Sequence, residues 1–177
     1  MTSLRVTARA ALAAGLLMVA QFVAIQPAHA GPTSGSGLFR LKNYNSQKCL
    51  DQTFTNNIEH PEVIAFDCTG GTNQMWYIEQ WPSGTHLINA RSGKCLDQNY
   101  TNGVEHPDIL AWHCSVDANQ VWNVLSLGTG GNQFRVRNTR SGNYLDQDYT
   151  NNVEHQAVLA YPFKGDAYNQ IWLITEY

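Results

Sequence analysis

The sequence contains three copies of one repeat, and this periodicity restricts its fold more than any other feature. The motif KCLDQ at residues 48–52 returns at 94–98 and, as NYLDQ, at 143–147; the motif NQxW occurs at 73–76, 119–122 and 169–172. The offset is 46 residues between the first two copies and 49 or 50 between the last two. The copies extend over residues 38–85, 86–132 and 133–177. Each is a supersecondary unit that needs its neighbours to bury its apolar side.

Each copy consists of short β-strand patterns. Residues 39–42 alternate apolar and polar side chains, as a half-buried strand does, and residues 49–51 follow a turn signal at 45–46. Residues 63–68 form an apolar run, and residues 74–78 complete the unit. No segment has sustained helical periodicity. Four strands in each of three copies therefore predict an all-β fold of about twelve strands.

The four cysteines lie at the same two positions of copies one and two. In copy three both positions are aromatic, Tyr144 and Phe163. Because the two cysteines are missing together from one copy, we expect each pair to bond within its own repeat. The predicted disulfides are Cys49–Cys68 and Cys95–Cys114, and we expect an aromatic pair in their place in copy three. Each disulfide stabilises the fold by about 3 kcal/mol in the chain-entropy model.

The N-terminus has the pattern of a secretory signal peptide. Arg5 and Arg9 precede an apolar run at 10–25, and the small residues around His29 match a signal-peptidase site after Ala30. A membrane anchor is the alternative, but the run is shorter than the ~20 apolar residues that span a bilayer. The sequence thus predicts a signal peptide at 1–30, a flexible lead at 31–37 and one secreted domain at 38–177.

The charge of the chain argues against two classes of partner. Outside the predicted leader, 9 basic residues face 14 acidic ones, so this part has a net charge of −5 and no cluster of lysine or arginine. A protein that binds nucleic acid presents a basic patch, and so does one that binds anionic membranes. We therefore expect neither nucleic-acid binding nor membrane insertion.

Three repeats of this length, each with Gln-x-Trp near its end and two with Cys-Leu-Asp upstream, resemble the ricin-type lectin family. That family includes the ricin B chain and many bacterial carbohydrate-binding modules, and the chain resembles a secreted bacterial member. The resemblance covers nearly all of residues 38–177. It implies a β-trefoil with a pseudo-threefold axis and one potential sugar site in each repeat.

The resemblance also implies which residues bind sugar. Each repeat has an aspartate after the first cysteine position, an aromatic residue before the second, and an Asn-Gln pair before the tryptophan. The implied sugar-binding residues are Asp51, Phe66, Asn73 and Gln74; Asp97, Trp112, Asn119 and Gln120; and Asp146, Tyr161, Asn169 and Gln170. The family often has a glutamine two residues before the aromatic, where this chain has Ile64, Leu110 and Leu159. The identity of the sugar is therefore open, galactose included.

These residue types suit a pyranose on chemical grounds alone. An aromatic ring packs on the apolar face of the sugar, a carboxylate accepts hydrogen bonds from neighbouring hydroxyls, and an amide both donates and accepts. Trp112 offers the largest ring, so we expect the second site to be the strongest. The tryptophans of the Gln-x-Trp motifs, in contrast, are predicted to lie in the core: Trp76, Trp122 and Trp172.

The segment Thr-Asn-x-x-Glu-His occurs three times and allows two interpretations. In the favoured one, Asn56, Asn102 and Asn151 form turns while the Glu and His residues hold the loop. In the other, a set of further residues extends the sugar pockets: His60, Tyr100, His106, Tyr149 and His155. A zinc site formed by the three histidines is disfavoured, and no metal or cofactor is predicted.

A binding protein is favoured over an enzyme. The chain has none of the zinc-protease, nucleophile-elbow or phosphate-loop motifs, and paired cysteines cannot act as nucleophiles. The sequence therefore predicts a non-enzymatic secreted lectin whose partners are glycans. The alternative is the lectin subunit of a larger secreted toxin complex, which would also bind protein partners.

Overall fold

The computed structural model describes residues 37–128 and 131–177 of the chain. The predicted signal peptide at 1–30 and all but the last residue of the predicted lead at 31–37 lie outside these residues. None of the helices in the described part is long and apolar enough to cross a membrane.

The described residues form twelve β-strands and three short 3-10 helices, so the all-β prediction is confirmed. The strands are β1 (Leu38–Asn43), β2 (Cys49–Thr55), β3 (Ile58–Phe66), β4 (Trp76–Trp81), β5 (Gly84–Asn89), β6 (Cys95–Thr101), β7 (Val104–Trp112), β8 (Trp122–Ser126), β9 (Gln133–Asn138), β10 (Tyr144–Thr150), β11 (Val153–Tyr161) and β12 (Trp172–Glu176). The 3-10 helices are η1 (Thr72–Gln74), η2 (Ala118–Gln120) and η3 (Tyr168–Gln170), and each contains the Asn-Gln pair of its repeat.

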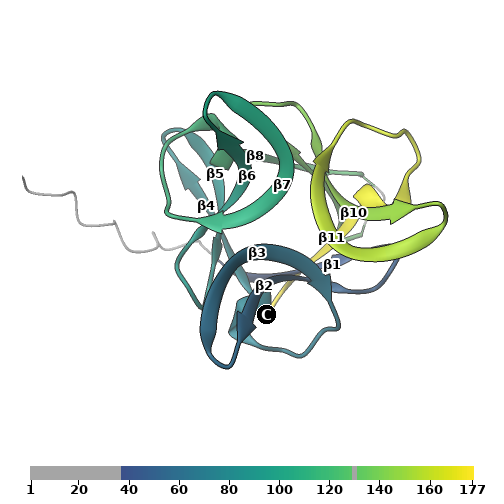
Figure 1. The fold of residues 1–177 in the computed structure, drawn as a ribbon. Coiled ribbons are helices and arrows are strands. Elements are labelled where there is room, and N and C mark those ends of the chain that lie inside the picture. Colours follow the sequence, from purple (N-terminus) through teal and green to yellow (C-terminus); the bar gives the residue numbers. More distant parts are fainter. Residues whose placement is uncertain (1–36, 129–130) are drawn as a thin grey trace, which may run out of the picture. The chain divides into compact units, whose positions relative to one another are not determined.

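The strands form a β-trefoil with one lobe for each repeat (Figure 1). The hairpins β2–β3, β6–β7 and β10–β11 surround the pseudo-threefold axis, and their second strands pair with one another. The other six strands are joined by the pairings β5–β4, β4–β1, β1–β12, β12–β9 and β9–β8. The three repeats thus place three equivalent hairpins on one end of the fold.

The tryptophans of the three Gln-x-Trp motifs lie at the centre of the core, as predicted. Trp76, Trp122 and Trp172 are fully buried and belong to one apolar cluster that all three repeats share. Each indole Nε1 donates to the carbonyl oxygen of the leucine in its own Leu-Asp-Gln motif, at 2.9–3.0 Å. The large apolar surface is therefore buried without leaving a polar atom unpaired.

Both predicted disulfides are present. Cys49 is bonded to Cys68 and Cys95 to Cys114, with Cα atoms 5.2 and 5.0 Å apart. In repeat 3 the rings of Tyr144 and Phe163 lie in contact, with centroids 5.3 Å apart. An aromatic pair thus fills the space that a disulfide occupies in the other two repeats, as the repeat pattern predicted.

The repeated Thr-Asn-x-x-Glu-His segments form the tips of the three hairpins. Asn56, Asn102 and Asn151 have φ angles of 51–54°, and the residue after each also has a positive φ. Two such residues form the tight turn that matches the twist of a two-stranded hairpin. The turn role of the asparagines is therefore confirmed.

The glutamates of these segments join neighbouring repeats. Glu59 of repeat 1 pairs with Lys94 of repeat 2 at 2.6 Å, and Glu154 of repeat 3 pairs with Lys48 of repeat 1 at 2.7 Å. Between repeats 2 and 3 the corresponding contact is an Asn143–Glu105 hydrogen bond of 3.5 Å. The segment therefore holds the repeats in register around the axis.

Candidate functional site

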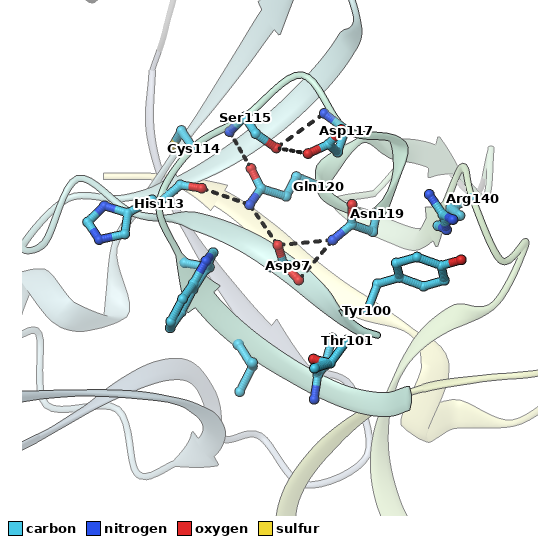
Figure 2. A pocket seen from close by; sticks show the side chains of 13 residues that line it. Asp97, Tyr100, Thr101, His113, Cys114, Ser115, Asp117, Asn119, Gln120 and Arg140 are labelled. Atoms are coloured by element: carbon cyan, nitrogen blue, oxygen red, sulfur yellow. Dashed lines mark hydrogen bonds between the residues drawn. The ribbon is translucent and has the colours of Figure 1, made fainter. Parts of the chain in front are cut away.

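A cavity in repeat 2 is lined by the complete set of residues predicted for that repeat's site. It has a volume of about 630 Å³, and Asp97, Trp112, Asn119 and Gln120 are among the residues that line it (Figure 2). Asp97 is on β6, Trp112 ends β7, and the two amides are on η2. The fold thus brings together three segments of one repeat that are separated in the sequence.

Asp97 lies at the bottom of this cavity, only 5% exposed, and is held by the two amides. The Nδ2 of Asn119 lies 3.1 Å from both carboxylate oxygens, and the Nε2 of Gln120 donates to Oδ2 at 2.6 Å. Figure 2 shows these three side chains converging. The two amides fix the orientation of the carboxylate, which keeps free lone pairs for further donors.

Gln120 supports the carboxylate of Asp97. It is 2% exposed, its Nε2 also donates to the carbonyl of His113, and its Oε1 accepts from the backbone N–H of Ser115. Gln74 and Gln170 make the corresponding bonds in the other repeats, and both are fully buried. The glutamine therefore connects the aspartate to the following loop, and its donors have no hydrogen left for a bound molecule.

The environment of Asp97 shifts the pKa of its carboxyl group. Burial raises the pKa of this carboxyl above the usual range, while the hydrogen bonds from Gln120 and Asn119 oppose the shift. The pKa values of Asp51 and Asp146 are raised by burial in the same way. Each repeat thus contains a carboxylate that takes up a proton at a higher pH than an ordinary aspartate.

One wall of the cavity includes the aromatic ring of Trp112, and another includes a side chain from the next repeat. Trp112 is 50% exposed, so its ring is accessible for stacking. Tyr100, one of the predicted pocket extensions, also lines the cavity, and the guanidinium of Arg140 lies 3.5 Å from the centre of its ring. Arg140 belongs to repeat 3, so two repeats share this site.

Sequence reasoning missed Arg140 and also His113, Ser115 and Asp117, which line the same cavity. A signal for the arginine was present: Arg91 and Arg140 occupy the same repeat position, directly before Ser-Gly. Arg91 lies 3.9 Å from the centre of the Phe54 ring and so repeats the contact at the boundary of repeats 1 and 2.

The site of repeat 1 is a smaller version of the same arrangement. A cavity of about 180 Å³ is lined by residues that include Asp51, Phe66 and Asn73. Asn73 donates to Asp51 at 2.9 Å and Gln74 at 2.7 Å. The Phe66 ring is 40% exposed, but it is smaller than the indole of Trp112 and has no polar atom.

Repeat 3 has the corresponding site residues, but a lysine contacts two of them. Asn169 and Gln170 each donate to Asp146 at 2.8 Å, and Tyr161 is 42% exposed. Here, however, the Nζ of Lys164 lies 3.7 Å from Asp146 Oδ2 and 4.0 Å from the centre of the Tyr161 ring. The aspartate and the aromatic residue of this repeat are therefore both in contact with a lysine.

Four other residues are predicted pocket extensions. His60 and His106 line neither of the two cavities described above, and the same holds for His155 and Tyr149. The backbone carbonyls of the three histidines accept hydrogen bonds from the Leu-Asp-Gln glutamines. Within residues 37–128 and 131–177, no group of three or more His, Cys, Asp or Glu side chains is placed to hold a metal ion.

Three equivalent lobes, each with a buried aspartate below an exposed aromatic ring, define a β-trefoil with repeated candidate binding sites. Residues 33–129 match the profile of the ricin-type beta-trefoil lectin domain, and residues 118–177 match that of the related lectin domain-like family. The chain belongs to the ricin-type beta-trefoil lectin domain family. A search of curated protein sequences found no significant match.

Solved structures share this fold. The designed threefold-symmetric protein ThreeFoil is 25% identical, with a TM-score of 0.69 over 80% of this chain and 99% of its own. The ricin B-like lectin of Macrolepiota procera, solved in complex with lactose, is 20% identical, with a TM-score of 0.63 over 81% of this chain and 98% of its own. An exo-beta-1,3-galactanase from Clostridium thermocellum is 19% identical, with a TM-score of 0.65 over 80% of this chain but only 30% of the enzyme.

Proposed function

We propose that this protein is a secreted lectin without catalytic activity that binds glycans mainly through the pocket of repeat 2. The observation that carries the proposal is the juxtaposition in one cavity of a fixed carboxylate, Asp97, and an exposed indole, Trp112. The pocket of repeat 1 is the second, weaker site. Family membership implies glycan binding in general; the particular pockets and their order of strength are our proposal.

The pocket of repeat 2 suits a pyranose ring. The indole of Trp112 takes the apolar face of the sugar, and Asp97 accepts hydrogen bonds from two neighbouring hydroxyls. The proposed role of Gln120 is to orient Asp97, because both its donor and its acceptor atoms are already used. Tyr100 and the stacked Arg140 form the far wall, where they meet a second sugar unit or a substituent.

Secretion is supported by the covalent structure. Two disulfides are typical of proteins that fold in an oxidising compartment. All four cysteines of the chain are paired in them. Together with the signal-peptide pattern of residues 1–30, this supports an extracellular location.

Catalysis is not part of the proposal, although two carboxylates line the cavity. A glycosidase acts through a pair of carboxyl groups placed on either side of the scissile bond. Asp97 is buried with two amides bound to it, and Asp117 accepts a hydrogen bond from Ser115 at 2.8 Å. The residue two before the site asparagine is Asp117 in repeat 2 but Gly71 in repeat 1, so the repeated unit itself contains only one carboxyl group at its site.

A glycan array tests the proposed function directly. The secreted protein is applied beside a variant with both Asp51→Ala and Asp97→Ala, and release of reducing sugar from each bound glycan is measured in parallel. We expect binding by the parent, none by the variant, and no released sugar from either. Equal binding by the folded variant would exclude these pockets as the site, and released sugar would contradict the non-enzymatic assignment.

Exchanging the two stacking residues should exchange the strengths of the two pockets. Trp112→Phe removes part of the apolar face in repeat 2 and is expected to weaken that site by about 1 kcal/mol, or roughly fivefold. Phe66→Trp should strengthen the site of repeat 1 by a similar factor. Both rings are 40–50% exposed, so the melting temperature should hardly change. Calorimetric titration with a monovalent glycan measures the effect, and an unchanged order of site strengths would refute it.

Binding should weaken on acidification at a higher pH than an ordinary aspartate would cause. The carboxylate is the form that accepts hydroxyl protons, and burial raises the pKa of Asp97 and of Asp51. Binding is therefore complete above the raised pKa and is lost as the pH falls through it. Burial favours the neutral carboxyl, so protonation of these two groups does not itself unfold the protein.

The measurement is glycan affinity between about pH 3.5 and pH 7, with circular dichroism to monitor the fold, since an ordinary aspartate titrates near 3.9. A variant with Asp51→Asn and Asp97→Asn is the matched control. It should bind weakly at every pH, without this transition. A parent affinity that stays constant down to about pH 4 would contradict the assigned role of the carboxylates.

A further inference from the structure

The third repeat has the complete set of site residues, yet its pocket contains a side chain of the protein itself. The ammonium of Lys164 lies 3.7 Å from Asp146 Oδ2 and 4.0 Å from the centre of the Tyr161 ring. These are the carboxylate and the aromatic face that correspond to Asp97 and Trp112 in repeat 2. Asp146 is 1% exposed, whereas Asp51 and Asp97 are each 5% exposed.

Lys164 occupies a position where the other repeats have a short hydroxyl side chain. Its backbone N–H donates to Gln170 Oε1 at 3.2 Å, just as Thr69 donates to Gln74 and Ser115 to Gln120. The loop from this residue to the site asparagine is also one residue longer in repeat 3. The lysine therefore stands at the entrance of the pocket and is long enough to reach its base.

The ammonium contacts both groups that a sugar would contact there. It forms an ion pair with the carboxylate that neighbouring hydroxyls would contact, and it lies over the ring face as the C–H groups of a pyranose would. The lysine side chain is itself 41% exposed, so solvent weakens this ion pair. A glycan can enter this pocket only after Lys164 leaves it.

The second wall of the site is also different in repeat 3. Arg91 and Arg140 stack on the Phe54 and Tyr100 rings of the preceding repeat. The equivalent position in repeat 1, which faces repeat 3, is Asn45. The third pocket thus lacks the arginine that the other two share and has a lysine from its own loop.

We propose that Lys164 is an internal ligand that closes the pocket of repeat 3, so that the protein presents two open glycan sites, in repeats 1 and 2. This inference rests on the proposed function of the other two pockets. Lys164 would then set the number of open glycan-binding sites on the protein, and hence its avidity for a dense glycan surface.

The test follows each pocket separately by NMR. The backbone amides of Asn73, Asn119 and Asn169 report on repeats 1, 2 and 3 while the labelled protein is titrated with methyl β-galactoside, methyl β-glucoside and methyl N-acetyl-β-glucosaminide. In the parent, Asn73 and Asn119 should shift, while Asn169 should need at least about tenfold more glycoside. In Lys164→Ser, which copies Ser115 of repeat 2, Asn169 should shift in the same concentration range as the other two.

Two further variants make the result specific. Adding Asp146→Ala to Lys164→Ser should abolish the new response at Asn169, because the opened pocket would lack its carboxylate. Lys42→Ser, which removes a lysine that lines neither cavity, should behave like the parent. If all three amides shifted together in the parent, this inference would be wrong while the proposed function would stand. The same holds if Asn169 did not shift in the Lys164→Ser protein. If no glycoside shifted any of the three amides and the array were also negative, the proposed function would fail, and the inference with it.

Discussion

Replacing Trp122 with alanine is expected to lower the free energy of unfolding by about 3–5 kcal/mol, as large truncations in a core do. The indole is fully buried in the cluster that all three repeats share, so its loss leaves a cavity that no single repeat can close. It also leaves the carbonyl of Leu96 without its 2.9 Å donor. Denaturant unfolding, followed by circular dichroism, measures the change, and Trp76→Ala and Trp172→Ala should have similar effects.

Trp112→Ala is the matched control, since it removes the same side chain from the surface. Trp112 is 50% exposed and ends β7, so we expect its loss to change the unfolding free energy by less than about 0.5 kcal/mol. The two variants should therefore separate stability from binding. A Trp122→Ala protein that unfolded like the parent but no longer bound glycan would show that the assignment of this residue to the core is wrong.

Removing the carboxylates of both open pockets should abolish binding to a dense glycan surface. Losing Asp51 or Asp97 leaves sugar hydroxyls unpaired in its pocket, at about 1–3 kcal/mol, or roughly 5- to 150-fold in affinity. On a surface that engages both pockets at once, the two losses multiply, so the double variant should bind far more weakly than either single variant. Asp97→Ala should have the larger single effect, because its pocket is the larger one and is lined by the indole.

Surface plasmon resonance measures the loss of affinity for an immobilised glycan, and calorimetry measures the loss of affinity for the free glycan. The two values are then compared. Glu176→Ala is the control for charge, because this carboxylate is exposed on β12 and lines neither cavity. It should bind like the parent. If the double variant lost no more affinity for the surface than for the free glycan, the two pockets would not act together.

Much of this architecture was predictable because each structural role occurs three times. A tryptophan at the same position of every repeat indicates a shared core, and Trp76, Trp122 and Trp172 do meet there. Two cysteines that are absent together from one repeat indicate a bond within the repeat, and Tyr144 and Phe163 take its place. Such inferences succeed because a residue and its equivalents must satisfy the same local packing.

The roles of the polar residues were harder to assign. Gln120 is expected from the sequence to support the fold as well as the sugar, and the structure shows its donor and acceptor atoms bound to Asp97, His113 and Ser115. A polar motif at a binding site has the same sequence whether its amide faces the ligand or supports the residue that does. Only the direction of its hydrogen bonds distinguishes the two, and that direction depends on how η2 packs against β6.

The sequence by itself determined the repeat, the all-β class and the disulfide pairing, and it indicated the candidate residues that recur in each repeat, because these follow from periodic, local constraints. Tertiary structure alone decided where the long side chains beside the candidate sites make their contacts. Arg140 reaches Tyr100 of the preceding repeat, and Lys164 turns back onto Asp146 and Tyr161. The repeated Arg-Ser-Gly marks the arginine but not its contact, because the direction of a long flexible side chain depends on how the loops pack against neighbouring strands.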